Sequence, residues 1–167
     1  VRFPDGAEDD DYLGGDTPYR VANRRLVSIS ELRLVKGFDA EAMNKLAPHV
    51  AALPARTGNN GNIATPINVN TATVPVLQSL AEGMSQVEAE KLVADRGEEG
   101  YASLPAFSQH GSLAGRGAVQ SPLSLESSNF LLDAEVEIGN ARVHLFSTIR
   151  RDKTSGSKVV MRTLGSQ

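Results

Sequence analysis

Apolar side chains recur at helical spacing in two stretches of the chain, and the first of these covers residues 26–53. Within it, Ser28 and Glu31 have the spacing of a capping box, in which each side chain satisfies a free backbone N–H group. Gly37 then permits a left-handed stop, and Asp39 is placed to cap the helix that follows. The pattern predicts two short helices joined at Gly37.

The second helical stretch, which runs over residues 67–110, follows the same plan. Its first helix is capped by Asn70 or the next residue, Thr71, and ends at Gly83. Ser85 and the glutamate three residues later form another capping box, which starts a longer helix. We therefore predict a second pair of helices joined at a glycine.

The two helical stretches can be aligned with each other. Gly37–Asp39 then falls on Gly83–Ser85, and Lys45–Leu46 falls on Lys91–Leu92. This alignment indicates two copies of one helix–glycine–helix unit. Two unrelated helical hairpins with ordinary caps explain the pattern equally well, so both interpretations stay open.

The C-terminal stretch alternates apolar and polar residues instead. Every second residue from Phe130 to Ile138 is apolar, and most residues between them are acidic. Gly139–Asn140 is a two-residue hairpin signal, and a polar turn further on leads to a third strand over residues 158–164. We predict an antiparallel meander whose apolar face requires a covering layer, most simply a long helix. The predicted fold class is α+β.

Composition narrows the classes of function. The chain has no cysteine, which excludes a disulfide framework, a thiolate zinc site and a cysteine nucleophile. Its net charge of -3 argues against a protein that binds a phosphate backbone, and the lack of tryptophan with only 5% aromatic residues argues against base stacking. No apolar run approaches the ~20 residues that span a bilayer. Because the chain opens on Val1–Pro4 without methionine, we expect a fragment whose targeting or membrane segment lies upstream.

Catalytic motifs are not recognisable in the sequence. It lacks the nucleophile-elbow, phosphate-loop and zinc-protease patterns. Its three histidines, His49, His110 and His144, lie far apart in unrelated contexts. A hydrolase built on His144 and a distant serine is therefore the weaker hypothesis, and we expect a protein that is not an enzyme.

An acidic run near the start of the chain is a candidate metal site. Calcium binds several oxygen atoms, which carboxylates and loop carbonyls supply. The spacing of this run is not that of an EF-hand loop, and on composition alone a solvated charge run is the simpler explanation. The candidate ligands are Asp5, Glu8, Asp9, Asp10 and Asp11.

The segment Ile67–Ala72, together with Gly83 and Arg96–Gly97, is similar to a helix-hairpin-helix module of DNA-uptake and repair proteins. In such modules the hairpin and the following helix offer backbone N–H groups to a phosphate. Here Glu82 places a negative charge at that position, and Asp39 does the same in the first stretch. We predict a structural hairpin that binds no nucleic acid, and keep a helix-hairpin-helix nucleic-acid-binding module as the alternative.

Five motifs together resemble the general secretion pathway protein K family, the large minor pseudopilin (GspK type) of the bacterial type II secretion system. The resemblance extends over nearly the whole chain. The motifs occur in the order Gly6–Asp9, Pro18–Arg24, Leu26–Leu32, Ile67–Ala72 and Ser127–Phe130.

This resemblance implies a pseudopilin-like antiparallel sheet, packed on a hydrophobic N-terminal helix, with a large α-helical domain inserted. In this chain the inserted domain corresponds to residues 1–122, and the last strands of the sheet correspond to residues 123–167. The N-terminal helix is absent from the fragment, which agrees with an apolar sheet face that lacks its cover. The helix-hairpin-helix-like units then belong to the inserted domain.

The resemblance also implies a structural subunit whose periplasmic domain is anchored in the inner membrane through the missing helix. Members of the family cap the tip of the pseudopilus and help to initiate it, in complex with the minor pseudopilins I and J, for protein export across the outer membrane. Calcium is known in the family. Glu8 and Asp9 lie in a matching motif and are the candidate ligands, whereas Asp5, Asp10 and Asp11 have weaker support.

Overall fold

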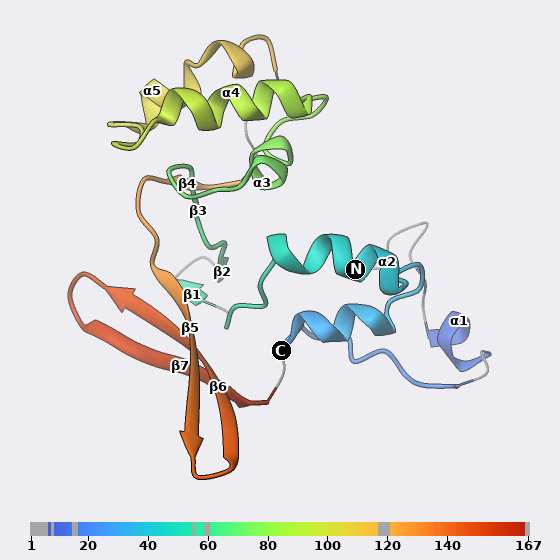
Figure 1. Ribbon diagram of the computed structural model, residues 1–167. Coiled ribbons are helices and arrows are strands. Elements are labelled where there is room, and N and C mark those ends of the chain that lie inside the picture. The colour runs from blue at the N-terminus through green and yellow to red at the C-terminus, as the bar shows by residue number, and fades with distance from the viewer. Residues whose placement is uncertain are drawn as a thin grey trace. The chain divides into compact units, whose positions relative to one another are not determined.

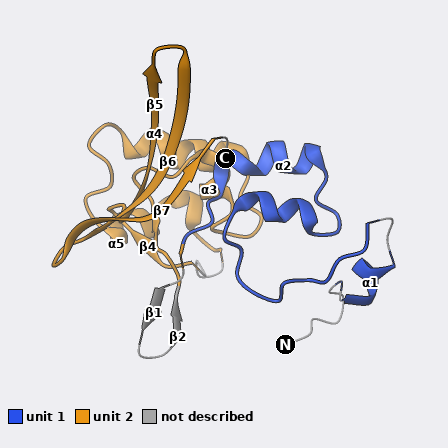
Figure 2. Cartoon of the chain, turned by 90° about the horizontal axis from the view of Figure 1, so that it is seen from below, with its two compact units in different colours: residues 1–53 blue, residues 54–167 orange. Residues whose placement is uncertain are grey.

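The computed structural model describes residues 7, 9–14, 17–54, 56–58, 61–116 and 121–165. Figure 2 shows that the chain forms two compact units, Val1–Leu53 and Pro54–Gln167. The family resemblance implies a different division, between an inserted domain that ends at residue 122 and a sheet that starts at residue 123. That boundary stays a prediction.

Short helices make up the first unit. They are α1 (Asp9–Leu13), η1 (Ile29–Leu34), α2 (Ala40–Leu46) and η2 (Ala47–His49), of which η1 and η2 are 3-10 helices. The capping predictions are confirmed: Glu31 accepts a hydrogen bond from the Ser28 amide at 3.0 Å, and the Asp39 carboxylate accepts from the Ala42 amide at 2.8 Å. Gly37 has a φ of +93°, as the left-handed stop requires.

Two tyrosines attach α1 to the rest of the first unit. The Tyr12 and Tyr19 rings lie 5.1 Å apart, the Tyr19 hydroxyl donates to the Leu34 carbonyl, and the Lys36 amide donates to the Tyr12 hydroxyl at 3.3 Å. Among the described residues of this unit, Met43 is the one apolar residue that is buried. The unit therefore depends on polar and aromatic contacts more than on a hydrophobic core.

The helical part of the second unit, residues 67–126, holds the main core. The four largest completely buried side chains lie at its centre, namely Val69, Leu77, Leu92 and Phe107. The elements of this part are β3 (Ile67–Asn68), α3 (Val74–Gln78), α4 (Gln86–Arg96), α5 (Leu104–Ser108), η3 (Gly111–Leu113) and β4 (Leu123–Ser124). A short hairpin of β1 (Arg56–Gly58) and β2 (Gly61–Ile63) precedes them.

One cap prediction in this part is wrong. The helix expected to start at Asn70 or Thr71 begins later, at Val74, with Thr73 as the N-cap residue. The reason is that Asn70 has another partner: its side-chain oxygen accepts from the Tyr101 amide at 2.7 Å. The second capping box is confirmed, because Ser85 and Glu88 exchange hydrogen bonds at the start of α4.

The second unit ends in the predicted meander of three antiparallel strands, which Figure 1 shows in orange and red. These strands are β5 (Asn129–Ile138), β6 (Ala141–Asp152) and β7 (Gly156–Leu164). The hairpin at Gly139–Asn140 is confirmed, since Ile138 pairs with Ala141 across it. Residues 123–124 form β4, which pairs in parallel with β3, and the antiparallel sheet starts at Asn129. The α+β class is confirmed.

Candidate functional site

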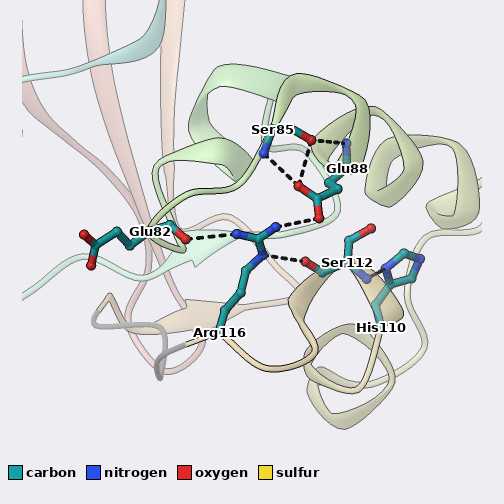
Figure 3. Close-up of polar contacts among 6 residues, drawn as sticks. All are labelled: Glu82, Ser85, Glu88, His110, Ser112 and Arg116. Carbon is teal, nitrogen blue, oxygen red and sulfur yellow. Dashed lines mark hydrogen bonds and ion pairs between the residues drawn. The ribbon is translucent and has the colours of Figure 1, made fainter.

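The turn between α3 and α4, which carries Glu82 and Gly83, is the hairpin that the sequence marked as a possible phosphate site. The end of this turn that leads into α4 is held by the capping box drawn in Figure 3. The Ser85 amide and the Ser85 hydroxyl both donate to one oxygen of the Glu88 carboxylate, at 2.8 and 2.7 Å. A carboxylate of the protein itself therefore occupies the start of α4.

Arg116 closes this hairpin from the opposite side. Its Nη2 atom lies 2.5 Å from the Glu88 carboxylate, its Nη1 donates to the Glu82 carbonyl at 3.0 Å, and its Nε donates to the Ser112 carbonyl at 3.0 Å (Figure 3). A Cβ atom added at Gly83 would lie 3.5 Å from the Arg116 guanidinium. The guanidinium thus covers Gly83 and joins the hairpin to Ser112 on η3.

The charge of Glu88 is strongly stabilised in this arrangement. The hydroxyl and amide of Ser85, followed by the Arg116 guanidinium, lower the pKa of Glu88 from 4.5 to about 2. The carboxylate is consequently ionised near neutral pH and remains paired with Arg116. This ion pair is partly shielded, because the two side chains are 18% and 33% exposed.

The geometry disfavours the alternative of a nucleic-acid-binding hairpin. Such a hairpin offers unpaired backbone N–H groups and a positive field to a phosphate. Here Glu88 supplies the anion at the helix start, and every side-chain nitrogen of Arg116 donates to an acceptor of the same chain. Sequence reasoning identified Glu82 and Glu88 but missed Arg116, because no local spacing links it to the hairpin.

The three histidines lie on separate elements. The His110 Nε2 lies 2.7 Å from Asp95, and its Nδ1 accepts a hydrogen bond from the Ser112 amide at 3.1 Å. Both ring nitrogens therefore have structural partners, and His110 acts as the cap of η3. His144 pairs with Glu135 on the neighbouring strand at 3.3 Å. These contacts explain His110 and His144 as structural residues.

The acidic run is only partly covered by the structure. Asp5 and Glu8 lie outside the described residues, Asp10 is exposed on α1, and Asp11 forms an ion pair with Lys36 at 3.0 Å. The Asp9 carboxylate accepts from the Val21 amide at 3.2 Å. Within the described ranges, no three histidine or acidic side chains come together as a metal site.

The second candidate surface is the apolar face of the sheet. Its side chains stand on alternate positions of β5 and on the facing positions of β6 and β7. They are open to solvent, with Ile138 73% and Leu164 71% exposed. The other large members are Phe130, Leu132, Val136, Val143 and Val159. The predicted uncovered face is confirmed, and contiguous exposed apolar surface of this kind marks an interaction site.

None of the helices in the described part of the chain has the length and apolar character needed to cross a membrane.

Two family profiles match the sequence, and both describe type II secretion system protein K. One covers residues 2–55 and the other covers residues 67–126, so that together they match more than half of the chain. The second profile coincides with the helical part of the second unit.

Curated relatives carry the same description. Type II secretion system protein K of Pseudomonas aeruginosa is 37% identical over 160 residues, which are 96% of this chain and 45% of that protein. The protein of this name from Pectobacterium carotovorum is 36% identical over 160 residues, which are 92% of this chain and 46% of that protein. The chain therefore spans somewhat less than half the length of these relatives.

This chain is similar to one solved structure in particular. It is a chain in the crystal structure of the GspK-GspI-GspJ complex from the enterotoxigenic Escherichia coli type 2 secretion system. It superimposes with a TM-score of 0.75 at 27% identity, over 97% of this chain and 56% of that chain. On these grounds the chain belongs to the family of type II secretion system protein K.

Proposed function

We propose that this chain is part of a minor pseudopilin, a structural subunit at the tip of the type II secretion pseudopilus. The observation that carries the proposal is the match to a chain of the GspK-GspI-GspJ complex over 97% of this chain. By this analogy the subunit assembles with the minor pseudopilins I and J, caps the tip and helps to start its assembly, so that proteins are exported across the outer membrane.

The open face of the sheet supports this role. A three-stranded sheet with one apolar face requires a second layer. We propose that an N-terminal helix of the longer protein supplies this layer and anchors the subunit in the inner membrane, with the described units in the periplasm. Seven large apolar side chains, from Phe130 to Leu164, are then covered by the helix.

The subunit works through its shape and surfaces rather than through catalysis. His110 uses both ring nitrogens in structural hydrogen bonds. The helical segments add bulk to the sheet, and such bulk prevents a further pseudopilin from adding at that end by steric exclusion.

Co-purification with the I and J pseudopilins of the same organism tests the proposal. The longer protein is expected to elute with both in one complex, whereas the major pseudopilin, added as a control at equal concentration, is not retained. Elution of the protein alone in the presence of folded I and J would contradict the assignment.

Calcium binding is a separate proposal that rests on Glu8 and Asp9. Titration calorimetry is expected to show calcium binding to the parent chain and its loss in the Glu8→Gln, Asp9→Asn double variant. Asp10→Asn is the matched control and is expected to bind normally. An isotherm without heat for the folded parent would reject calcium at this segment.

A further inference from the structure

The His110 side chain caps η3 with a ring nitrogen, where an oxygen atom is the usual acceptor. Its Nδ1 accepts a hydrogen bond from the Ser112 backbone amide at 3.1 Å (Figure 3). A backbone amide nitrogen donates and does not accept, so Nδ1 carries no proton in this arrangement. The proton of the neutral ring therefore lies on Nε2.

The other ring nitrogen keeps the ring in place. Nε2 lies 2.7 Å from a carboxylate oxygen of Asp95 on α4, to which it donates its proton. Nε2 carries a proton in this neutral ring and in the charged ring alike, so the bond to Asp95 persists in both states. The ring also packs edge-on against Tyr101, with the two centroids 6.5 Å apart, and the side chain is only 16% exposed. These contacts hold Nδ1 toward Ser112 whether or not the ring is charged.

A charged ring is incompatible with this cap. The imidazolium carries a proton on both nitrogens, so Nδ1 becomes a donor. Two donors, the Nδ1–H of His110 and the N–H of Ser112, would then face each other. Ser112 is buried, and a buried donor without an acceptor is costly. The charged ring and the closed start of η3 therefore exclude each other.

The ionisable groups around the ring do not relieve this conflict. On α4, the Asp95 carboxylate attracts the charged ring. In the loop before α5, Tyr101 stays neutral, since burial raises the pKa of its hydroxyl. Beyond η3, Arg116 directs its Nε to the Ser112 carbonyl at 3.0 Å. Of these three side chains Asp95 alone is hydrogen-bonded to the ring, and its partner is Nε2 rather than Nδ1.

We propose that His110 is a proton-sensitive cap: the neutral ring closes the start of η3, and the charged ring releases it. Histidine side chains commonly take up a proton between about pH 8 and about pH 5, so η3 opens as the medium becomes mildly acidic. The release weakens the contact of Arg116 with the Ser112 carbonyl. The Arg116–Glu88 pair persists, because the pKa of Glu88 is about 2. This inference rests on contacts within the second unit and is independent of the proposed secretion role.

Nuclear magnetic resonance of the isotope-labelled chain tests this cap. The ring nitrogens of His110 report its tautomer and charge, and solvent exchange of the Ser112 amide, corrected for the intrinsic rate, reports the cap. At about pH 8, Nδ1 is expected to be the unprotonated ring nitrogen and the Ser112 amide to be protected. As the pH falls toward about 5, protection is expected to drop by about fivefold or more, in step with protonation of the ring.

Two variants assign the change to His110. His110→Asn supplies a side-chain oxygen as the cap and takes up no proton, so the Ser112 amide is expected to stay protected across this range of pH. His144→Gln removes a histidine of β6 and is the control, which is expected to keep the pH dependence of the parent. A drop in protection that persists in His110→Asn, or one that disappears in His144→Gln, overturns the proposal.

The parent chain alone also gives results that decide. A His110 ring that becomes charged while the Ser112 amide keeps its protection overturns the proposal. A ring that stays neutral over this range of pH overturns it as well, as does a neutral ring whose proton lies on Nδ1. These outcomes do not depend on the folding of His110→Asn.

Discussion

At the scale of single residues, the Glu88 carboxylate has two roles in the hairpin. One oxygen receives the Ser85 hydrogen bonds that start α4, and the other receives Arg116 from the loop after η3. A local cap and a long-range contact are therefore coupled through one group, which also explains why its pKa falls to about 2.

This coupling predicts how stability depends on pH. The pKa of Glu88 is lower in the folded chain than its ordinary 4.5, so the stabilisation is fully present above that value and is lost as pH falls from 4.5 toward 2. Glu88→Gln is expected to lower the free energy of unfolding at neutral pH and to flatten its decline over this acid range. Urea unfolding at a series of pH values measures both effects.

The exposed Glu98, in the turn after α4, provides the control for this measurement. Glu98→Gln is expected to keep the slope of the parent. Equal slopes for the parent and Glu88→Gln would show that the carboxylate is not held as described.

At the scale of elements, the caps and turns predicted correctly from the sequence are those formed by residues that lie close together along the chain. The capping boxes at Ser28 and Ser85 and the turn at Gly139–Asn140 each involve residues a few positions apart, so their spacing identifies them. The start of α3 was mispredicted because the partner of Asn70 is Tyr101, in another loop. Arg116 was missed for the same reason: its partners lie on elements that only the fold brings together.

The contact between Asn70 and the turn before α5 gives a prediction at this scale. Gly100 has a φ of +76°, and a Cβ atom there would lie 2.9 Å from the Asn70 side chain. Gly100→Ala is therefore expected to lower the free energy of unfolding by ~1–3 kcal/mol, through strain and displacement of Asn70. Urea unfolding provides the measurement.

Gly111 is the matched control, since its added Cβ would meet no atom within 4 Å. Gly111→Ala is expected to have a clearly smaller effect. An equal loss of unfolding free energy in the two alanine variants would mean that the close approach of Gly100 to Asn70 does not affect stability.

At the scale of the whole molecule, the most informative feature is the exposed apolar face of the sheet. Alternation in the sequence predicted the apolar face of the sheet, and the structure confirms that residues such as Ile138 and Leu164 are exposed on it. The chain spans somewhat less than half the length of the relatives, and the covering helix of the proposed function is not among its described elements.

If a helix covers the apolar face, Ile138→Ser has different effects on stability in this chain and in the longer protein. Ile138→Ser in this chain is expected to change the free energy of unfolding by no more than ~0.5 kcal/mol, because the side chain is 73% exposed. In the longer protein that carries the N-terminal helix, the same change is expected to cost ~1.5–3 kcal/mol. Asp133→Ser, on the opposite face, is expected to be neutral in both forms; equal effects of Ile138→Ser in both would argue against a covering helix.

The central claim, a structural subunit at the tip, is tested most directly by locating the protein on assembled pseudopili. Antibodies against this chain, carrying gold particles, are applied to isolated pseudopili and viewed by electron microscopy, with antibodies against the major pseudopilin as the control. The account predicts one gold cluster at a single end of each filament, while the control decorates its length. Gold spread along the filaments, or none on filaments of normal length, would contradict it.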